Sequence, residues 1–273
     1  MKKFKISGRV IVLFLVLCIT LLASYIYFIS PTHIKITSYT YSSSLVDDQL
    51  KGFKIAYLSD VNLNDEDDIE HLSNAISKLN QHDYDLFIFG GDLYESKEIF
   101  SRDAVVKALS KINCDYGKFC VYGDKDLSNK KEVKSIFTEA GIELLNNTSR
   151  SIYYNNAYFE LVACSNDEKI STIEFNKNKL VIDVTHQPDS FKSNANNVSL
   201  QLSGHSLGGS VYIPLIGGIL KDEGFKTYNH GKYTKKDATL IVSNGVKGTT
   251  DHPFKIFCSN EILLIKLSTK KSK

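Results

Sequence analysis

Short apolar segments alternate with helical patterns in the first half of this 273-residue chain, and this alternation restricts the fold more than any other feature. Runs rich in β-branched and aromatic residues predict strands at residues 34–39, 53–59, 85–89 and 119–122. Apolar residues at helical spacing predict helices near residues 69–79, 105–112 and 133–140. From residue 53 onward the order is βαβαβα, which is typical of an α/β protein.

The second half of the chain changes to strand patterns. Strands are predicted at residues 151–154, 158–163, 180–185, 198–202, 239–243, 254–258 and 261–266. The first two of these flank Asn155-Asn156, which is typical of a hairpin turn. The length of the chain fits one sizeable domain better than two full domains.

Residues that can bind a metal follow five of the predicted strands. They are Asp60, Asp92, Asp124, His186 and His205. Any one of them alone is most simply an ordinary turn residue or a lone histidine. In α/β sheets, however, ligands bind beyond the carboxyl ends of the strands, so we expect these five side chains to converge on one site. Carboxylate and imidazole ligands suit Mn, Fe or Zn.

The first thirty residues predict a membrane anchor. An uncharged, mostly apolar run at residues 10–29 follows a basic cluster of Lys2, Lys3, Lys5 and Arg9. A helix of about 20 residues, at roughly 1.5 Å per residue, spans the roughly 30 Å hydrocarbon layer. No clear small-residue cleavage site follows, which favours an uncleaved anchor, and the basic cluster predicts an N-terminus inside the cell.

We therefore expect two parts in a single-pass protein of the cell membrane. Residues 1–30 form a basic cytoplasmic segment and a transmembrane anchor, with the membrane as partner through residues 10–29. Residues 31–273 form one domain outside the cytoplasm. Cys18 lies in the apolar run behind large residues, which argues against a lipidated cysteine.

Neither the charge nor the cysteine content indicates a further partner. The formal net charge is +2 with both signs interspersed, so no nucleic-acid partner is expected. No C-x-x-C spacing of a zinc or redox site occurs among Cys114, Cys120, Cys164 and Cys258. We interpret these four as small buried hydrophobes, although the sequence leaves disulfide pairing open.

At these strand ends the chain resembles the calcineurin-like metallophosphoesterases, in particular their membrane-anchored or exported bacterial branch. The family motifs D-x-H, G-D, G-N-H-D, a later lone His and G-H-x-H correspond to residues 59–62, 90–92, 123–126, 185–189 and 204–207. The segments H-Q-P-D, L-S-G-H-S, G-G-S-V-Y-I-P-L and E-I-L-L-I-K-L are also similar to that branch. The resemblance covers about residues 34–267 and implies a four-layer αββα sandwich of two mixed sheets, with two metals bridged by an Asp.

The chain departs from the family pattern mainly at one of the two metals. The ligands of the first metal correspond to Asp60, Asn62, Asp92 and Leu207. Two imidazoles are lost there, so we expect this first site to be weak or empty. The ligands of the second metal correspond to Asp92, Asp124, His186 and His205, all of which can still ligate. The resemblance therefore implies a divalent metal (Mn, Fe or Zn), with one ion rather than two.

Lys125 stands where the family has a histidine that assists the leaving group or steadies the phosphate. An ammonium holds a phosphate as a point charge but is a poor proton donor near neutral pH. Lys125 and Asp126 are the candidate catalytic residues. We also hypothesise that Lys125 occupies the first metal site as a built-in cation.

The resemblance leaves two functions open. One is metal-dependent hydrolysis of a phosphoester, a monoester or diester, on a phosphorylated small molecule, a lipid or an envelope precursor. The other is a catalytically inactive pseudo-phosphoesterase that acts as a ligand-binding module.

A third function rests on residues 204–208, which match the G-x-S-x-G nucleophile elbow of a serine hydrolase with Ser206 as the nucleophile. That elbow requires a helix directly after the serine. Residues 210–214 are instead β-branched and end in proline, so this alternative is the weakest of the three.

Overall fold

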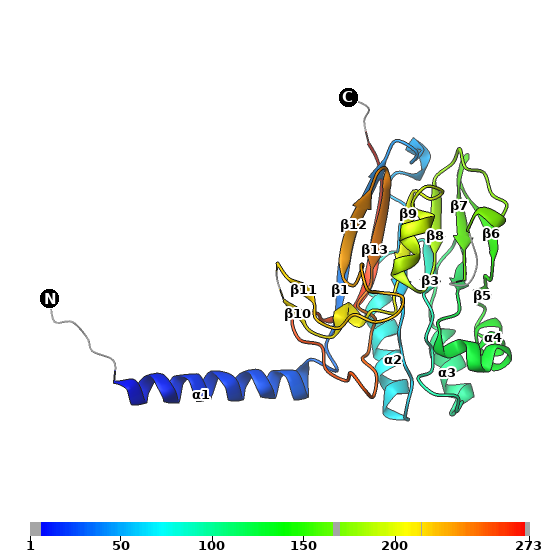
Figure 1. Ribbon diagram of the computed structural model, residues 1–273. Helices are drawn as coiled ribbons and strands as arrows, with labels where there is room; N and C mark the ends of the chain where they lie inside the picture. Colours follow the sequence, from blue (N-terminus) through cyan, green and yellow to red (C-terminus); the bar gives the residue numbers. More distant parts are fainter. Residues whose placement is uncertain (1–6, 166–169, 214, 271–273) are drawn as a thin grey trace.

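The computed structural model describes residues 7–165, 170–213 and 215–270, and within them two mixed six-stranded sheets lie face to face (Figure 1). Three lysines of the basic cluster, Lys2, Lys3 and Lys5, lie outside the described residues, as do Pro214 and residues 271–273 at the end of the expected domain. The α/β architecture with two mixed sheets is confirmed.

The first sheet contains the strands that precede the three aspartates. It is built from β1 (Ile34–Ser43), β2 (Lys54–Leu58), β3 (Leu86–Phe89), β4 (Lys118–Cys120), β5 (Glu143–Leu144) and β14 (Asn260–Thr269). The spatial order is β1-β14-β2-β3-β4-β5. Strands β2 to β5 run parallel, so their carboxyl ends share one edge, whereas β14 is antiparallel to β2 and parallel to β1.

The second sheet contains the strands that precede the two histidines. It is built from β6 (Thr148–Tyr154), β7 (Ala157–Ala163), β8 (Val181–Val184), β9 (Leu200–Ser203), β12 (Gly231–Lys235) and β13 (Ala238–Val242). The order is β12-β13-β9-β8-β7-β6, and the four central strands are parallel. A separate small ribbon pairs β10 (Tyr212–Ile213) with β11 (Gly217–Gly218).

Three apolar cores separate four layers of structure. The helices α2 (Asp67–Leu79), α3 (Arg102–Leu109) and α4 (Lys130–Glu139) cover the outer face of the first sheet and pack on it through side chains such as Leu72 and Phe89. The core between the sheets includes the rings of Phe53 and Phe159, whose centroids are 5.4 Å apart. The outer face of the second sheet is covered by loops and the short helix α5 (Phe191–Asn194). The predicted αββα sandwich is therefore present, with a thin fourth layer.

The first helix, α1 (Gly8–Ser24), extends away from the two sheets (Figure 1). It continues through a π-helical turn at Tyr25–Ile29. The segment Gly8–Phe28 has a mean hydropathy of 2.7 and none of it is buried. By length and composition this helix is long and apolar enough to cross a membrane.

Most of the elements expected from the sequence are confirmed, but one predicted strand is wrong, and the strands β5, β10, β11 and β12 were not predicted. The strand predicted at residues 254–258 is wrong, because this segment is a loop with a single bridge between Val211 and Ile256. The strand β12 was not predicted, since it pairs at the edge of its sheet and exposes Lys232 and Thr234, which leaves it without an apolar pattern.

The five cysteines all lie in the described part of the chain and are free thiols. Cys120, Cys164 and Cys258 are buried and Cys114 is partly buried, which fits their interpretation as small core residues.

Asp183 on β8 makes the stability of the fold depend on pH. Its carboxylate is fully buried and accepts hydrogen bonds from the hydroxyl of Thr185 at 3.1 Å and the amide of Asn194 at 3.1 Å. Burial raises the pKa of Asp183 from 3.8 to about 7. The folded protein therefore keeps a proton that the unfolded chain has lost, so this residue's contribution to stability is largest at low pH and declines as the pH rises through that interval.

We expect the free energy of unfolding of Asp183→Asn to decline less between pH 4 and pH 7 than that of the wild-type protein, in which Asp183 and Asp126 both contribute to the decline. Urea unfolding of the full chain in detergent at a series of pH values measures this difference. Asp237→Asn, at an exposed position, is the matched control and should keep the wild-type pH profile. Parallel profiles for wild type and Asp183→Asn would contradict the expectation.

Candidate metal centre

The loops that follow β2, β3, β8 and β9 are joined to one another by backbone hydrogen bonds. The amide of Asp60 donates to the carbonyl of Gly91 at 3.0 Å, which ties the loops after β2 and β3. The amide of Gly204 donates to the carbonyl of His186 at 3.1 Å, which ties the loops after β9 and β8. The edge where the two sheets meet therefore carries one compact cluster of polar side chains.

Three of the five predicted ligands form a group that could hold a metal ion. Ligand atoms of Asp92, His186 and His205 all lie within 4.8 Å of one another. The Nε2 atom of His186 is 3.4 Å from Oδ2 of Asp92. Its Nδ1 atom lies 2.7 Å from the carbonyl oxygen of Gly90, and because a carbonyl only accepts, Nδ1 donates there. Nε2 is buried and has no hydrogen-bond partner among the described residues, which suits a metal ligand.

The charge of this group is balanced by neighbouring side chains. Burial opposes protonation of His186, but the carboxylate of Asp92 outweighs it and raises the pKa of His186 to about 10. Burial likewise opposes ionisation of Asp92, yet His186 and Lys125 lower its pKa below the usual range. A proton or a divalent cation at His186 therefore stabilises the same buried carboxylate.

Asp124 joins the group from the loop after β4. Its Oδ2 atom is 3.1 Å from Nδ1 of His205 and accepts a hydrogen bond from Nε2 of Gln187 at 2.9 Å. The Nε2 atom of His205 lies 2.8 Å from the carbonyl of Glu223, so Nε2 donates and Nδ1 is the atom directed at the site. Both Oδ2 of Asp124 and Nδ1 of His205 are potential metal ligands, and the residues present thus fit a divalent metal.

Asp60 lies beside this group but is directed at backbone. It is fully buried, and its two carboxylate oxygens accept from the amide of His205 at 3.0 and 3.1 Å. This contact fixes the loop that presents the imidazole of His205. A role of Asp60 as a direct metal ligand stays a prediction.

Lys125 reaches the position where the sequence places the weakened first metal. Its Nζ atom donates to Oδ1 of Asn62 at 2.6 Å and lies 3.8 Å from Oδ2 of Asp92. Leu207 also corresponds to a ligand of that metal. It is buried and, like Lys125, lines a small pocket. The ammonium therefore contacts two of the residues that correspond to ligands of the first metal.

Asp126 is a candidate catalytic residue in the sequence, but its carboxylate is hydrogen-bonded to backbone amides. It is buried, and its carboxylate accepts from the amides of Asp92 at 2.8 Å, Leu93 at 3.0 Å and Gly123 at 2.8 Å. Burial and the neighbouring carboxylate of Asp92 raise the pKa of Asp126 to about 7. These contacts favour a positioning role, and a direct catalytic role for Asp126 stays a prediction.

The backbone around the site is strained. Of twelve described non-glycine residues with positive φ, five belong to the cluster: Asp60, Asn62, Asp92, His205 and Leu207. Close packing of the loops adds to this, since a Cβ atom on Gly123 would lie 2.1 Å from Oδ1 of Asp92. Backbone strain of this kind concentrates at functional sites, where neighbouring contacts hold the side chains in place.

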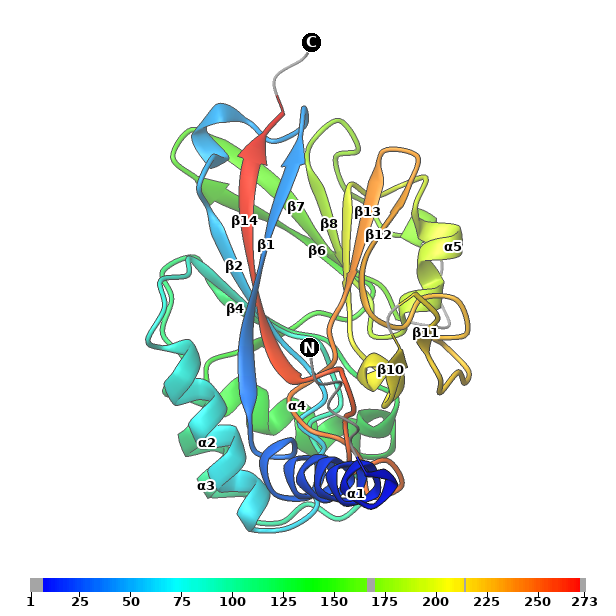
Figure 2. The same ribbon diagram turned by 90° about the vertical axis from the view of Figure 1, so that its left-hand side faces the viewer.

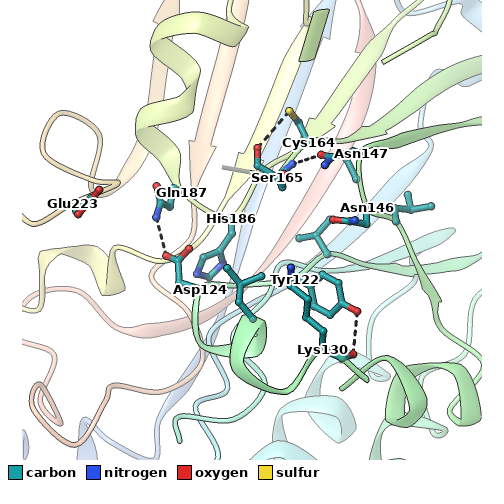
Figure 3. Close-up of a pocket in the computed structure, with 15 residues that line it drawn as sticks. Tyr122, Asp124, Lys130, Asn146, Asn147, Cys164, Ser165, His186, Gln187 and Glu223 are labelled. Carbon is teal, nitrogen blue, oxygen red and sulfur yellow. Dashed lines mark hydrogen bonds between the residues drawn. The ribbon is translucent and has the colours of Figure 1, made fainter. Parts of the chain in front are cut away.

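Two pockets open on this cluster from different sides. The larger, of about 300 Å³, is reached between Asp124 and His186 and is lined by polar groups such as Tyr122, Asn146 and Gln187 (Figure 3). The smaller, of about 160 Å³, contains Lys125. Asp124 lines both pockets, so a molecule in either one can approach the cluster.

Ser206 lacks the setting of a nucleophile elbow. Its side chain is fully buried and its hydroxyl donates to the carbonyl of Asn229 at 2.9 Å. A short 3₁₀ turn at Leu207–Gly209 follows it in place of an α-helix. These contacts favour a structural role for the serine.

The sequence interpretation missed residues that hold the ligands in place. Gln187 orients Asp124, and the ring of Phe225 packs edge-on against His205 with centroids 5.2 Å apart. Gln187 follows His186 directly in the H-Q-P-D segment, which was a signal for its role. No sequence motif indicated Phe225, because its contact with His205 depends on how its loop folds in three dimensions.

Comparisons with known proteins give metallophosphoesterases as relatives. No protein-family model matches the sequence. The uncharacterized metallophosphoesterase YkuE of Bacillus subtilis (strain 168) is 29% identical over 256 residues, which are 90% of this chain and 89% of that protein. The phosphodiesterase YaeI of Escherichia coli (strain K12) is 25% identical over 81% of this chain and 84% of its own length.

A further relative, the uncharacterized metallophosphoesterase Cj0846 of Campylobacter jejuni, is 26% identical over 81% of this chain and only 60% of its own length. Among solved structures, a putative 5'-nucleotidase from Staphylococcus aureus has a TM-score of 0.46 at 10% identity, covering 81% of this chain. The chain spans 55% of that protein's length. The curated relatives are thus metallophosphoesterases, a family that depends on divalent metals.

Replacement of Asp126 tests its positioning role. Asp126→Ala leaves three buried N–H donors without an acceptor, and each such group costs about 1–3 kcal/mol. We expect the free energy of unfolding to fall by about 3 kcal/mol, with a smaller loss for Asp126→Asn because one acceptor oxygen remains. Asp115→Ala, at an exposed position, is the control. An Asp126→Ala protein of wild-type stability would contradict this role.

Proposed function

We propose that this homologue of the metallophosphoesterases hydrolyses a phosphoester with one divalent cation, assisted by the ammonium of Lys125. The observation that carries the proposal is the convergence of Asp92, His186 and His205, whose ligand atoms lie within 4.8 Å of one another. The orphaned Nε2 atom of His186 at the centre of this group supports a metal rather than a purely structural cluster.

Asp92, Asp124, His186 and His205 would hold the cation, and this mixed carboxylate and imidazole set suits Mn, Fe or Zn. When bound, a divalent cation supplies Lewis acidity toward a phosphoryl oxygen and lowers the pKa of water. The protein's own contribution is to hold these ligands in position, through the contacts of His186 with Gly90 and of Asp124 with Gln187.

Lys125 would replace the first metal. Its contacts with Asn62 and Asp92, at 2.6 and 3.8 Å, give the buried carboxylate a fixed positive partner in addition to His186. Such an ammonium can stabilise negative charge on a phosphoryl oxygen. An ammonium is a poor proton donor to a leaving group near neutral pH. The reaction would therefore favour substrates whose leaving group departs without protonation.

The organic part of the substrate would occupy the polar pocket of about 300 Å³ beside Asp124 and His186 (Figure 3). The name of the E. coli relative supports a phosphodiester among the substrates. A phosphorylated small molecule, a lipid or an envelope precursor all remain compatible with this proposal.

The second candidate is a pseudo-phosphoesterase that binds a phosphorylated ligand without hydrolysing it. The position of Lys125 also favours this second candidate. While its ammonium contacts Asn62 and Asp92, two metal ions cannot bind on either side of a phosphoryl group. Turnover measurements decide between the two candidates.

The membrane arrangement is also part of the proposal. The segment Gly8–Phe28 would cross the membrane once, with Arg9 and the preceding lysines inside the cell and residues 31–273 outside the cytoplasm.

A metal count tests the single-ion centre. After equilibration of the full chain with Mn²⁺ or Zn²⁺ and removal of free metal, we expect about one bound ion per chain by mass spectrometry of the metal, because four protein ligands complete only one centre. His205→Ala should bind markedly less. His82→Ala, which changes an exposed histidine, should bind as the wild type does.

The same measurement on a triple variant, Asn62→His, Lys125→His and Leu207→His, should give about two ions per chain, since it restores imidazoles and removes the ammonium. Two ions in the unaltered protein would contradict the role of Lys125 as a resident cation.

Turnover of bis(p-nitrophenyl) phosphate and p-nitrophenyl phosphate, with Mn, Fe, Zn or Mg added, tests the reaction. We expect Lys125→Ala to lower kcat by roughly tenfold or more, which corresponds to about 1.4 kcal/mol of lost transition-state stabilisation. Lys134→Ala, on an exposed face of α4, should be unchanged. A metal-loaded wild-type protein with no turnover would favour the binding module.

A further inference from the structure

The small ribbon of β10 and β11 ends in an unusually apolar turn. Leu215 and Ile216 are 105% and 75% exposed, and Ile219, just after the ribbon, is 59% exposed. We call these three residues the apolar tip. Large aliphatic side chains that project this far from a fold are not explained by its own core.

The apolar tip lies on the side of the molecule from which α1 projects. In Figure 1 the ribbon and the helix extend toward the same side, and in the turned view of Figure 2 β10 and β11 lie above and to the right of α1, which points toward the viewer. A bilayer crossed by α1 would therefore meet this face first.

Contacts within the chain connect the ribbon to the end of the helix. The rings of Tyr27 and Phe254 lie 5.8 Å apart, which joins the helical segment to the loop before β14. The amide of Tyr212 donates to the carbonyl of Ile256 in that loop at 2.9 Å. The neighbouring Phe257 is 70% exposed and adds a fourth large apolar side chain to this surface.

We propose that the apolar tip inserts into the same lipid bilayer as α1 and holds the domain against it. The inference rests on the proposed crossing of the membrane by α1, and it goes beyond that crossing by assigning a second, independent contact. The bilayer is the occupant that fits, because the tip is continuous with the face at which the helix leaves the domain, and apolar side chains partition into the lipid boundary.

Insertion of the apolar tip would affect the position of the candidate metal centre relative to the membrane. The chain continues from β11 into a wall of the smaller pocket, to which Leu220 and Phe225 contribute. The amide of Leu220 donates to the carbonyl of Gly209 at 3.2 Å, and the carbonyl of Glu223 accepts from His205 at 2.8 Å. The inserted tip thus fixes this wall beside the lipid surface, where a lipid phosphoester would present its headgroup.

Tryptophan fluorescence tests the insertion, because the natural chain contains no tryptophan and each variant then has one. The full chain is reconstituted into phosphatidylcholine vesicles with and without brominated acyl chains, as Ile216→Trp at the tip, Val16→Trp in α1 and Tyr153→Trp on β6. Tyr153 is 66% exposed, at the far edge of the second sheet, and serves as the water-exposed control.

We expect Ile216→Trp to emit at shorter wavelength than Tyr153→Trp and to be quenched about twofold by brominated lipid, as for a residue that enters the headgroup and acyl boundary. Quenching of Val16→Trp but not of Ile216→Trp would overturn the insertion of the tip and leave the anchor intact. No quenching of either would overturn both. A short-wavelength emission of Ile216→Trp that brominated lipid does not quench would assign the tip to a protein partner and also overturn the proposal.

Discussion

The buried carboxylate of Asp92 is the charge around which the site is arranged. A buried ion is costly unless it is paired and hydrogen-bonded, and Oδ2 of Asp92 lies 3.4 Å from His186 and 3.8 Å from Lys125. The carboxylate of Asp126 accepts from the amide of Asp92 and thereby fixes its backbone. Because these partners come from two different loops, after β4 and after β8, the loops must keep one arrangement for the charge to be compensated.

This constraint explains why the replacements in the chain belong together. Asn62 in place of a histidine supplies a carbonyl oxygen that can accept from an ammonium, and it does accept from Lys125 at 2.6 Å. Leu207 supplies no ligand and contributes apolar surface to the pocket. In the proposed single-ion centre, the ammonium of Lys125 would supply beside Asp92 the positive charge that a second metal would otherwise provide.

The opposite end of the smaller pocket connects the site to the segments near α1. The path from Tyr27 through Phe254 and Ile256 reaches the ribbon, and the chain after the ribbon returns to His205. The helix that could cross a membrane and the metal centre are therefore linked by a short series of contacts. In the proposed membrane arrangement, this linkage would limit the orientations that the domain can take toward a lipid surface.

The sequence by itself determined the order of strands and helices and the residues that follow each strand. Periodicity and residue type are local properties, and they were sufficient to predict that Asp92, His186 and His205 come together, at the edge where the two sheets meet. Only the tertiary structure decided that Asp60 and Asp126 are directed at backbone amides, that residues 254–258 form a loop, and that an apolar tip lies on the side from which α1 projects. These features depend on contacts between residues far apart in the chain, which a local pattern does not record.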